Sequence, residues 1–295
     1  MSAVLAAGAT HAPVRAVGFI GLGDQGAPMA RAIAASGFEL HVWARREGSL
    51  DALAGLPFVR QQSPAALAAA GDIVLLVLRD DSDVDDVLEN QGMLAALRPG
   101  SILVNHGTGD PQAAARFAGV AAAHGVDFLD APVSGGGPGA EARTLATIVG
   151  GDAGALERAR PVFDTYSGSI VRLGGPGAGQ TAKLLNNALT MTNLKNAVDV
   201  LGMADAIGVD VAAFRELLAT SSGGSFVIQA LGAQITPEIA PHLQGLMRKD
   251  IDHFADAVGR LGVDVEDVRA RGRAGAAGLV AVVELVDRHL AARGR

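Results

Sequence analysis

Residues 21–26 read Gly21-Leu22-Gly23-Asp24-Gln25-Gly26 and lie between a short apolar run, 16–20, and a stretch of helical composition, 27–36. Glycine at the first position lets a chain leave a strand sharply, and glycine at the second lets the backbone approach a pyrophosphate. The third glycine lets the new helix pack against the strand, and the helix start offers unpaired N–H groups to phosphate oxygens. The spacing therefore predicts a dinucleotide-binding turn, with all six residues as cofactor contacts.

Strand-like and helix-like runs alternate after this turn. We expect strands at 39–43, 72–78, 101–105, 126–129, 144–149 and 170–173, with helices between them at 64–70, 82–90, 111–124 and 152–163. Such alternation is typical of an α/β fold with a mostly parallel, doubly wound sheet of the Rossmann type. Ligands bind beyond the carboxyl ends of the strands, so the segments Leu78-Arg79-Asp80 and 105–109 are expected to line the ligand crevice, with Leu78 and Arg79 as cofactor contacts.

The character of the chain changes at the glycine-rich segment 174–179. From about Gln180 onward the pattern predicts an all-α domain, with helices at 180–207, 211–219, 247–261 and 265–290. We expect a flexible tail over residues 1–15, a dinucleotide-binding domain over 16–175 and a helical substrate and dimerisation domain over 176–295.

The end of the second predicted strand bears on the choice of dinucleotide. An acidic residue there would accept hydrogen bonds from the ribose 2′-hydroxyl of NAD. This strand instead runs into Ala44-Arg45-Arg46, which offers two guanidinium groups able to hold a 2′-phosphate. The sequence therefore favours NADP(H) over NAD(H), with Arg45 and Arg46 as cofactor contacts.

Composition narrows the class of protein. The chain has 295 residues, 49% of them hydrophobic, no cysteine and a formal net charge of −7. Without cysteines there are no disulfides and no thiolate chemistry, the seven histidines lack metal-ligand spacing, and the negative charge offers no basic patch for nucleic acid. No apolar run is long enough for a membrane span. We therefore expect a cytoplasmic protein with no metal, nucleic-acid or membrane partner.

Four motifs in order along the chain resemble the β-hydroxyacid dehydrogenases, the group of 3-hydroxyisobutyrate dehydrogenase and of tartronate and succinic semialdehyde reductases. The resemblance covers about residues 17–256 and rests on Gly18-Phe19-Ile20-Gly21-Leu22-Gly23, Asp130-Ala131-Pro132-Val133-Ser134-Gly135-Gly136, Gly179-Gln180-Thr181-Ala182-Lys183-Leu184-Leu185-Asn186-Asn187 and Lys249-Asp250. It implies hydride transfer between a nicotinamide cofactor and a small hydroxy acid.

Lys183 is the expected general acid/base. It lies in the first turns of a long predicted helix among apolar neighbours, and partial burial lowers the pKa of a lysine toward the range useful for proton transfer. A surface charge is the ordinary alternative for one lysine on a helix, and the resemblance favours the catalytic role. Asn187 is four residues on, so it shares the same helix face and is expected to orient Lys183 or hold a substrate hydroxyl.

The resemblance also implies the remaining contacts. Ser134, Gly135 and Gly136 would hold the substrate carboxylate, and backbone N–H groups in such a glycine segment suit an anion. Thr108, Lys249 and Asp250 would contact the cofactor, whereas His242 would either donate to a polar substrate tail or lie in solvent. The chain departs from the family pattern at several places: Gln25 replaces a methionine, Gly107 stands where serine is typical, Arg143 replaces a glycine, and the late segment Gly275-Ala276-Ala277-Gly278 lacks its aspartate.

The resulting prediction is an NADP(H)-dependent oxidoreductase that interconverts a small β-hydroxy acid and its aldehyde or keto acid. Two alternatives remain: an imine reductase, which shares the architecture but typically lacks a lysine at the Lys183 position, and a non-catalytic NADP-binding scaffold, which would be expected to lose that lysine. The apolar helix faces at 189–200 and 279–290 predict a homodimer.

Overall fold

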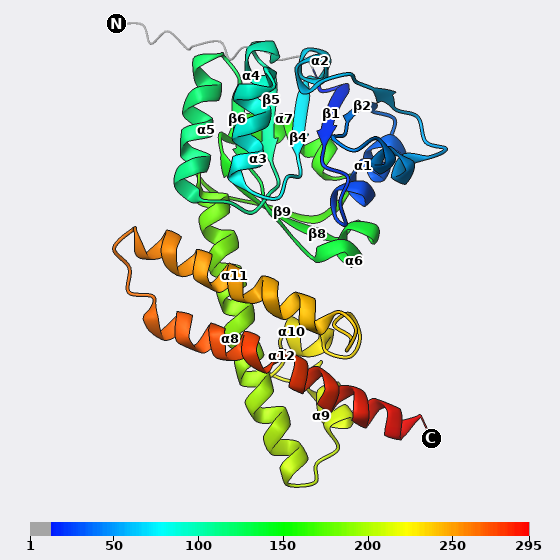
Figure 1. The fold of residues 1–295 in the computed structure, drawn as a ribbon, viewed down its shortest axis with the longest axis vertical. Helices are drawn as coiled ribbons and strands as arrows, with labels where there is room; N and C mark the ends of the chain where they lie inside the picture. Colours follow the sequence, from blue (N-terminus) through cyan, green and yellow to red (C-terminus); the bar gives the residue numbers. More distant parts are fainter. Residues whose placement is uncertain (1–12, 295) are drawn as a thin grey trace, which may run out of the picture. The chain divides into compact units, whose positions relative to one another are not determined.

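The computed structural model describes residues 13–294, which divide into two compact units between Gln180 and Thr181 (Figure 1). The flexible tail expected over residues 1–15 lies outside the described part for its first twelve residues. No helix within residues 13–294 is long and apolar enough to cross a membrane.

The first unit is built on a sheet that has nine strands in the described residues, in the order β3-β2-β1-β4-β5-β6-β8-β7, with β9 on β8. The strands are β1 (Ala16–Ile20), β2 (Glu39–Trp43), β3 (Val59–Arg60), β4 (Ile73–Leu76), β5 (Ile102–Asn105), β6 (Asp127–Asp130), β7 (Val133–Ser134), β8 (Leu145–Gly151) and β9 (Ser167–Gly174). The run from β3 to β6 is parallel, whereas β8 pairs antiparallel with β6 and β7. The predicted α/β fold with a doubly wound sheet is confirmed.

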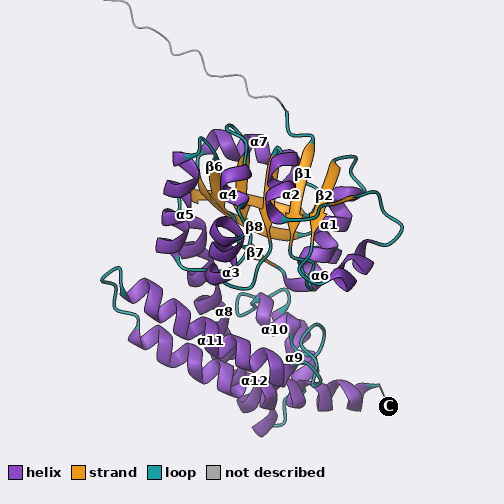
Figure 2. Ribbon diagram, turned by 45° about the horizontal axis from the view of Figure 1, so that its top comes forward, coloured by secondary structure: helices purple, strands orange, loops and turns teal. Residues whose placement is uncertain are grey.

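Helices cover both faces of this sheet (Figure 2). They are α1 (Gly26–Ala34), η1 (Glu47–Leu53), α2 (Pro64–Ala70), α3 (Asp81–Asp85), the π-helical η2 (Asp86–Asn90), α4 (Met93–Ala96), α5 (Pro111–Ala123), α6 (Gly136–Glu141) and α7 (Ala153–Phe163). Polar side chains set several starts, since Ser63, Asp110 and Asp152 each accept a hydrogen bond from a backbone N–H in the first turn of α2, α5 and α7.

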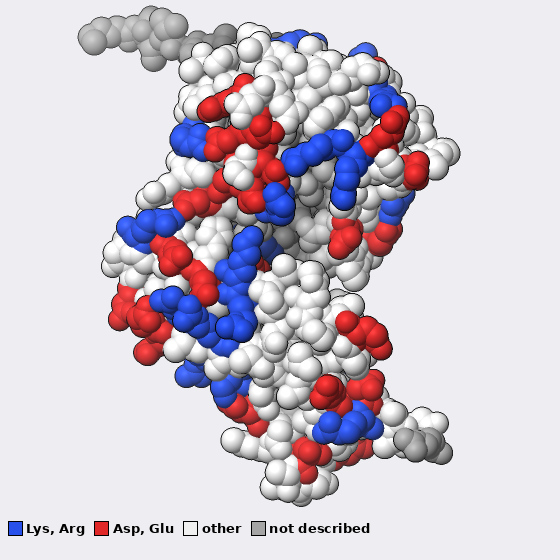
Figure 3. Space-filling model, viewed as in Figure 1, with Lys and Arg blue, Asp and Glu red and all other residues white. Residues whose placement is uncertain are grey.

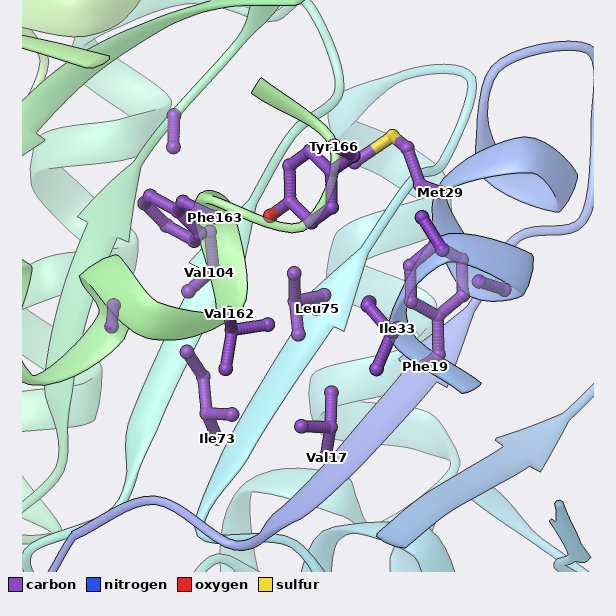
Figure 4. Close-up of a cluster of buried hydrophobic side chains, with 14 of the residues drawn as sticks. Val17, Phe19, Met29, Ile33, Ile73, Leu75, Val104, Val162, Phe163 and Tyr166 are labelled. Carbon is purple, nitrogen blue, oxygen red and sulfur yellow. The ribbon is translucent and has the colours of Figure 1, made fainter. Parts of the chain in front are cut away.

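The apolar runs of the central strands explain why they are buried on both faces. In β4, Ile73 and Leu75 join one core cluster and Val74 and Leu76 join the other, as the two-residue period of a strand requires. The first cluster packs β1, β4 and β5 against α1 and α7, with Phe19, Phe163 and Tyr166 among its large side chains (Figure 4). The parallel sheet is therefore a rigid platform, with its carboxyl edge free for a site.

The second unit is helical, with α8 (Ala178–Ala206) entering it from the first unit and followed by α9 (Val211–Leu218), α10 (Phe226–Ala230), α11 (Ala240–Gly259) and α12 (Glu266–Arg293). Glycines on one stripe of α12 allow close helix packing. A Cβ at Gly275 would lie 2.2 Å from the carbonyl oxygen of Met191 in α8, and one at Gly278 would lie 2.8 Å from the side chain of Val198. The segment 275–278 thus has a packing role within this unit.

Differences from the sequence expectations are local. The long strands and helices are confirmed to within a few residues, except that α11 begins seven residues before the expected Met247, at Ala240. The short elements β3, β7, α4, α6, α10 and η1 were not predicted, because so few residues carry no periodicity. The stretch 279–290 was expected to form part of a dimer face. Its large apolar side chains pack within the core of the second unit, with Leu279 and Val283 fully buried.

Candidate active site

The ends of the parallel strands form one row at the carboxyl edge of the sheet. Ile20 at the end of β1 lies opposite Trp43 of β2 and Leu76 of β4, and Asn105 of β5 continues the row between Leu76 and Asp130. The segments that follow these residues are those expected to bind cofactor and substrate. Because the strands are parallel and in register, the fold brings these segments to the same edge.

The glycine turn has the steric features that a dinucleotide site requires. Gly21 has φ 107°, and a Cβ there would lie 2.0 Å from the carbonyl oxygen of Val77. A Cβ at Gly26 would lie 1.8 Å from the carbonyl oxygen of Gly21, so α1 can start only with glycine at that position. Around Gly23, by contrast, the space within 4 Å is open. The first and third glycines serve the fold, and the second leaves room for a phosphate.

A cavity of about 440 Å³ opens beside this turn. Its lining includes residues from the glycine turn and from the ends of β2 and β4, with Trp43, Arg45, Arg46, Leu78 and Arg79 among them. Of the predicted cofactor residues in these three segments, the cavity brings together Gly21, Leu22, Gly23, Arg45, Arg46, Leu78 and Arg79, whereas Asp24, Gln25 and Gly26 are not in its lining. Open space at Gly23 and three arginines in the cavity lining fit a nucleotide with phosphate groups.

The loop after β5 is held by a side chain far along the chain. Gln180, fully buried at the start of α8, accepts a hydrogen bond from the Gly109 amide at 2.9 Å and donates one to the Gly107 carbonyl at 2.7 Å. A Cβ at Gly107 would lie 2.7 Å from the carbonyl oxygen of Leu78, so the backbone at this point favours glycine over the serine of the family. Thr108, a predicted cofactor contact, stands half-buried between these two anchored glycines.

Asp130, at the end of β6, holds the backbone around the start of α8. Its carboxylate accepts hydrogen bonds from the backbone amides of Gly177 and Gln180, each at 2.8 Å. Burial raises the pKa of this fully buried group, and these amide donors oppose the rise. Neither Asp130 nor Gln180 was given a role from the sequence, although both belong to the quoted motifs. Each could have been recognised in the sequence as a polar residue close to small or apolar neighbours and to a glycine-rich segment.

A buried histidine and tyrosine adjoin this edge. Nδ1 of His106 lies 2.6 Å from the Ala131 carbonyl oxygen, and Nε2 lies 3.0 Å from the hydroxyl of Tyr166. A carbonyl only accepts, so Nδ1 carries the proton and Nε2 accepts from the tyrosine. Burial lowers the pKa of His106 to about 4, which keeps the ring neutral. His106 thereby joins the loop after β5 to the segment that leads to Ser134.

The residues predicted to bind the substrate carboxylate lie at the end of β7 and the start of α6. Ser134 ends β7, while Gly135 and Gly136, with φ values of 130° and 63°, lead into α6. A Cβ on the next residue, Gly137, would lie 3.4 Å from the backbone oxygen of Asp24 in the dinucleotide turn. The proposed acid-binding segment therefore lies directly beside the proposed pyrophosphate-binding turn.

Arg143, just beyond α6, is the one non-glycine residue with a positive φ, 58°, among residues 13–294. The family has glycine at this position, and the backbone keeps the left-handed conformation that glycine adopts freely. Arginine in place of glycine at this position therefore strains the backbone after α6, but the turn keeps its shape.

In the second unit, Lys183 and Asn187 lie one turn apart on α8, and Asp250 lies on α11. Nδ2 of Asn187 donates a hydrogen bond to Oδ2 of Asp250 at 3.2 Å. Burial lowers the pKa of Lys183 to about 8, against the opposing effect of the Asp250 charge. Burial raises the pKa of Asp250, and Lys183 is the strongest of the groups that oppose the rise. This arrangement yields an amine that can change protonation state near neutral pH.

Two other predicted residues lie on α11. Lys249 is exposed, and its charge also opposes the rise in the Asp250 pKa. His242 is exposed. Asp250, expected to contact the cofactor, contacts Asn187 in the described structure.

Comparison with known proteins identifies the family of this chain. Residues 16–175 match the family model described as the NAD binding domain of 6-phosphogluconate dehydrogenase, and residues 177–278 match the NAD-binding domain of NADP-dependent 3-hydroxyisobutyrate dehydrogenase. The chain belongs to the β-hydroxyacid dehydrogenase family. It is a nicotinamide-dependent dehydrogenase of the type that acts on CH–OH groups.

Members of known activity are similar over most of the chain. The NAD-dependent L-serine dehydrogenase of Pseudomonas aeruginosa is 34% identical over 217 residues, 73% of either chain. The 2-hydroxy-3-oxopropionate reductase of Escherichia coli is 34% identical over 74% of this chain and 75% of its own. Among solved structures, a 3-hydroxyisobutyrate dehydrogenase of Mycobacterium tuberculosis with L-serine superposes with a TM-score of 0.80 at 26% identity, covering 93% of this chain and 98% of that chain.

Proposed function

We propose that this protein is an NADP(H)-dependent oxidoreductase that interconverts a small β-hydroxy acid and its aldehyde or keto acid. The observation that carries the proposal is the Lys183 amine, whose pKa is lowered to about 8 beside the Asn187–Asp250 pair. A half-buried amine with a lowered pKa costs stability, and a non-catalytic scaffold would have no reason to retain it. The lysine also supports carbonyl chemistry over imine reduction.

Different residues of the chain take the catalytic and the binding roles in this reaction. A nicotinamide cofactor held by the glycine turn and the adjoining cavity would supply the hydride chemistry that interconverts the alcohol and carbonyl carbons. Lys183 accepts the hydroxyl proton during oxidation and donates it back during reduction, with Asn187 orienting the amine or the substrate hydroxyl. Ser134 and the amides of Gly135 and Gly136 bind the carboxylate, which fixes the reacting carbon in place.

The preference for NADP(H) is proposed from the end of β2. Arg46 is exposed and forms no ion pair with any residue in the range 13–294, so its guanidinium is available to a 2′-phosphate. Arg45 lines the same cavity. The relative from Pseudomonas aeruginosa is NAD-dependent, so the preference has to be measured for this chain.

A homodimer is proposed from the outer face of α8. Leu189, Met203 and Ile207 are 60%, 64% and 78% exposed, and such large apolar side chains along one helix favour association with a second copy. Sedimentation equilibrium at several concentrations tests this assembly. The cytoplasmic location stays a prediction, which cell fractionation tests.

The decisive experiment measures NADPH oxidation with a panel of substrates. The panel contains glyoxylate, a cyclic imine, and the semialdehydes of succinate, tartronate and methylmalonate. The reverse direction uses NADP⁺ or NAD⁺ with L-serine and 3-hydroxyisobutyrate, both suggested by the relatives. Lys183→Ala should lower kcat/KM on the preferred acid by about a hundredfold or more.

Lys195→Ala is the matched control, because Lys195 lies on the same helix and pairs with Asp199. It should retain activity. Imine turnover that survives Lys183→Ala, or tight NADPH binding without turnover of any substrate, would contradict the proposal.

A further inference from the structure

Helix α3 and its flanks carry five carboxylates in the seven residues 80–86. Four of them contact groups other than Arg45. Asp80 caps α3 and binds Arg79, Asp81 accepts from the Asp110 amide, Asp85 binds Arg116 through two hydrogen bonds, and Asp86 accepts from Asn90 and Gln91. Figure 3 shows acidic and basic side chains gathered side by side on this face of the first unit. The fifth carboxylate, Asp83, lies in the wall of the cofactor cavity.

Asp83 joins two of the cavity's three arginines. Its Oδ1 lies 2.9 Å from a terminal nitrogen of Arg45, and its Oδ2 lies 3.2 Å from a terminal nitrogen of Arg79. The Asp83 side chain is only 15% exposed, whereas those of Arg45 and Arg79 are 61% and 74% exposed. The carboxylate is thus a fixed, inner group that holds two outer, movable guanidinium groups.

The ion pair between Asp83 and Arg45 changes the charge that a ligand meets at the end of β2. The sequence there contains two arginines and no acid, which predicted a site without a repelling carboxylate. The tertiary structure supplies that carboxylate from α3, 38 residues away along the chain. Arg45 therefore already has a negative partner when a cofactor arrives.

We propose that Asp83 is a specificity-determining residue whose carboxylate competes with a ribose 2′-phosphate for Arg45, and so limits the preference for NADP(H) over NAD(H). The inference rests on the proposed function, because it assumes that the cavity takes the adenosine end of the cofactor. A 2′-phosphate carries up to two negative charges, so it gains less from a guanidinium that is already neutralised and is repelled by the nearby carboxylate. A ribose 2′-hydroxyl experiences neither effect.

The test measures binding of two cofactor fragments, 2′,5′-ADP and 5′-AMP, by titration calorimetry at fixed ionic strength. Asp83→Asn should bind 2′,5′-ADP about five- to tenfold more tightly than the wild type, with 5′-AMP unchanged. The substitution leaves the cap of α3 in place, because Asp80 provides it through the Asp83 backbone amide.

Asp85→Asn is the matched control. It removes the same charge from the same helix, but its partner Arg116 is not among the residues that line the cavity. It should leave both affinities unchanged. If Asp83→Asn weakens 2′,5′-ADP, alters both ligands by the same factor, or changes neither, the proposal is overturned.

Different variants test the proposed preference for NADP(H) itself, so its failure can be told apart from failure of the inference about Asp83. In the wild type, 2′,5′-ADP should bind more tightly than 5′-AMP, and Arg45→Ala with Arg46→Ala should abolish the difference. Equal binding of the two fragments, unaffected by loss of the arginines, removes the NADP(H) preference whatever Asp83→Asn does. A preference that depends on the arginines but ignores Asp83 removes only the inference about Asp83.

Discussion

Asn187 donates a hydrogen bond from Nδ2 to Oδ2 of Asp250 over 3.2 Å and thereby ties α8 to α11 one turn from Lys183. The same carboxylate carries the charge that raises the pKa of Lys183 against the lowering by burial. One side chain of α11 thus both contacts the orienting asparagine and tunes the proposed acid/base. This dual role yields a direct prediction.

Activity should follow the protonation of Lys183. Oxidation needs the neutral amine, so kcat/KM should rise with pH up to about 8 and then level off, whereas reduction needs the ammonium and should fall above about 8. Asp250→Asn removes the charge that raises this pKa, so both profiles should move about one unit toward lower pH. The measurement is the pH dependence of kcat/KM in each direction.

Asp252→Asn provides the control for this shift, because Asp252 lies on the same helix and pairs with Arg273. It should leave the profiles in place. Profiles that stay unchanged in Asp250→Asn would show that another group sets the pH dependence.

His106 should make stability depend on pH. Its pKa is about 4 in the folded protein and near 6.5 when unfolded, so between these values the unfolded chain binds more protons. Stability is therefore full above pH 6.5 and falls as the pH drops toward 4, by up to about 3 kcal/mol. Urea unfolding at a series of pH values measures the slope.

His106→Gln should flatten this slope, whereas His124→Gln should not, because His124 is exposed on the surface. Tyr166→Phe removes the donor to Nε2 and should cost about 1–3 kcal/mol at neutral pH. A wild-type slope that persists in His106→Gln would assign it to other groups.

Arg143→Gly should stabilise the first unit. The residue has φ 58°, a conformation that costs a side-chain-bearing residue about 1–2 kcal/mol and glycine much less. Part of the gain is offset by the greater entropy of glycine in the unfolded chain, so we expect about 1 kcal/mol or slightly less in denaturant unfolding. Arg143→Ala keeps the strain while removing the charge and should give no gain; an equal gain there would point to charge instead of backbone conformation.

Gly275→Ala should destabilise the second unit. The added methyl group would lie 2.2 Å from the Met191 carbonyl oxygen and 2.9 Å from the Lys195 nitrogen, both backbone atoms of α8. Separation of the two helices should cost about 1–3 kcal/mol in thermal or denaturant unfolding. Gly245→Ala on α11, where the space within 4 Å is open, should instead stabilise by up to about 1 kcal/mol through helix propensity.

Local patterns determined a large part of this protein. The glycine turn at 21–26 and the alternation of apolar strands with helices could each be identified within a window of a few residues. These features are set by backbone sterics and by hydrophobic periodicity, both of which act along the chain. The resemblance of four motifs to the β-hydroxyacid dehydrogenases then singled out Lys183 and implied the class of reaction.

Tertiary structure decided what depends on residues far apart in sequence. Asp83 meets Arg45 across 38 positions, and Gln180 holds Gly107 across 73. The glycine stripe of α12 became a packing surface only when α8 lay against it. The sequence shows which groups are present, whereas hydrogen bonds and ion pairs depend on distances of a few ångströms that only packing fixes. The sequence by itself therefore determined the fold and the proposed catalytic lysine, and the tertiary structure decided which carboxylate neutralises the arginine beside the proposed cofactor cavity.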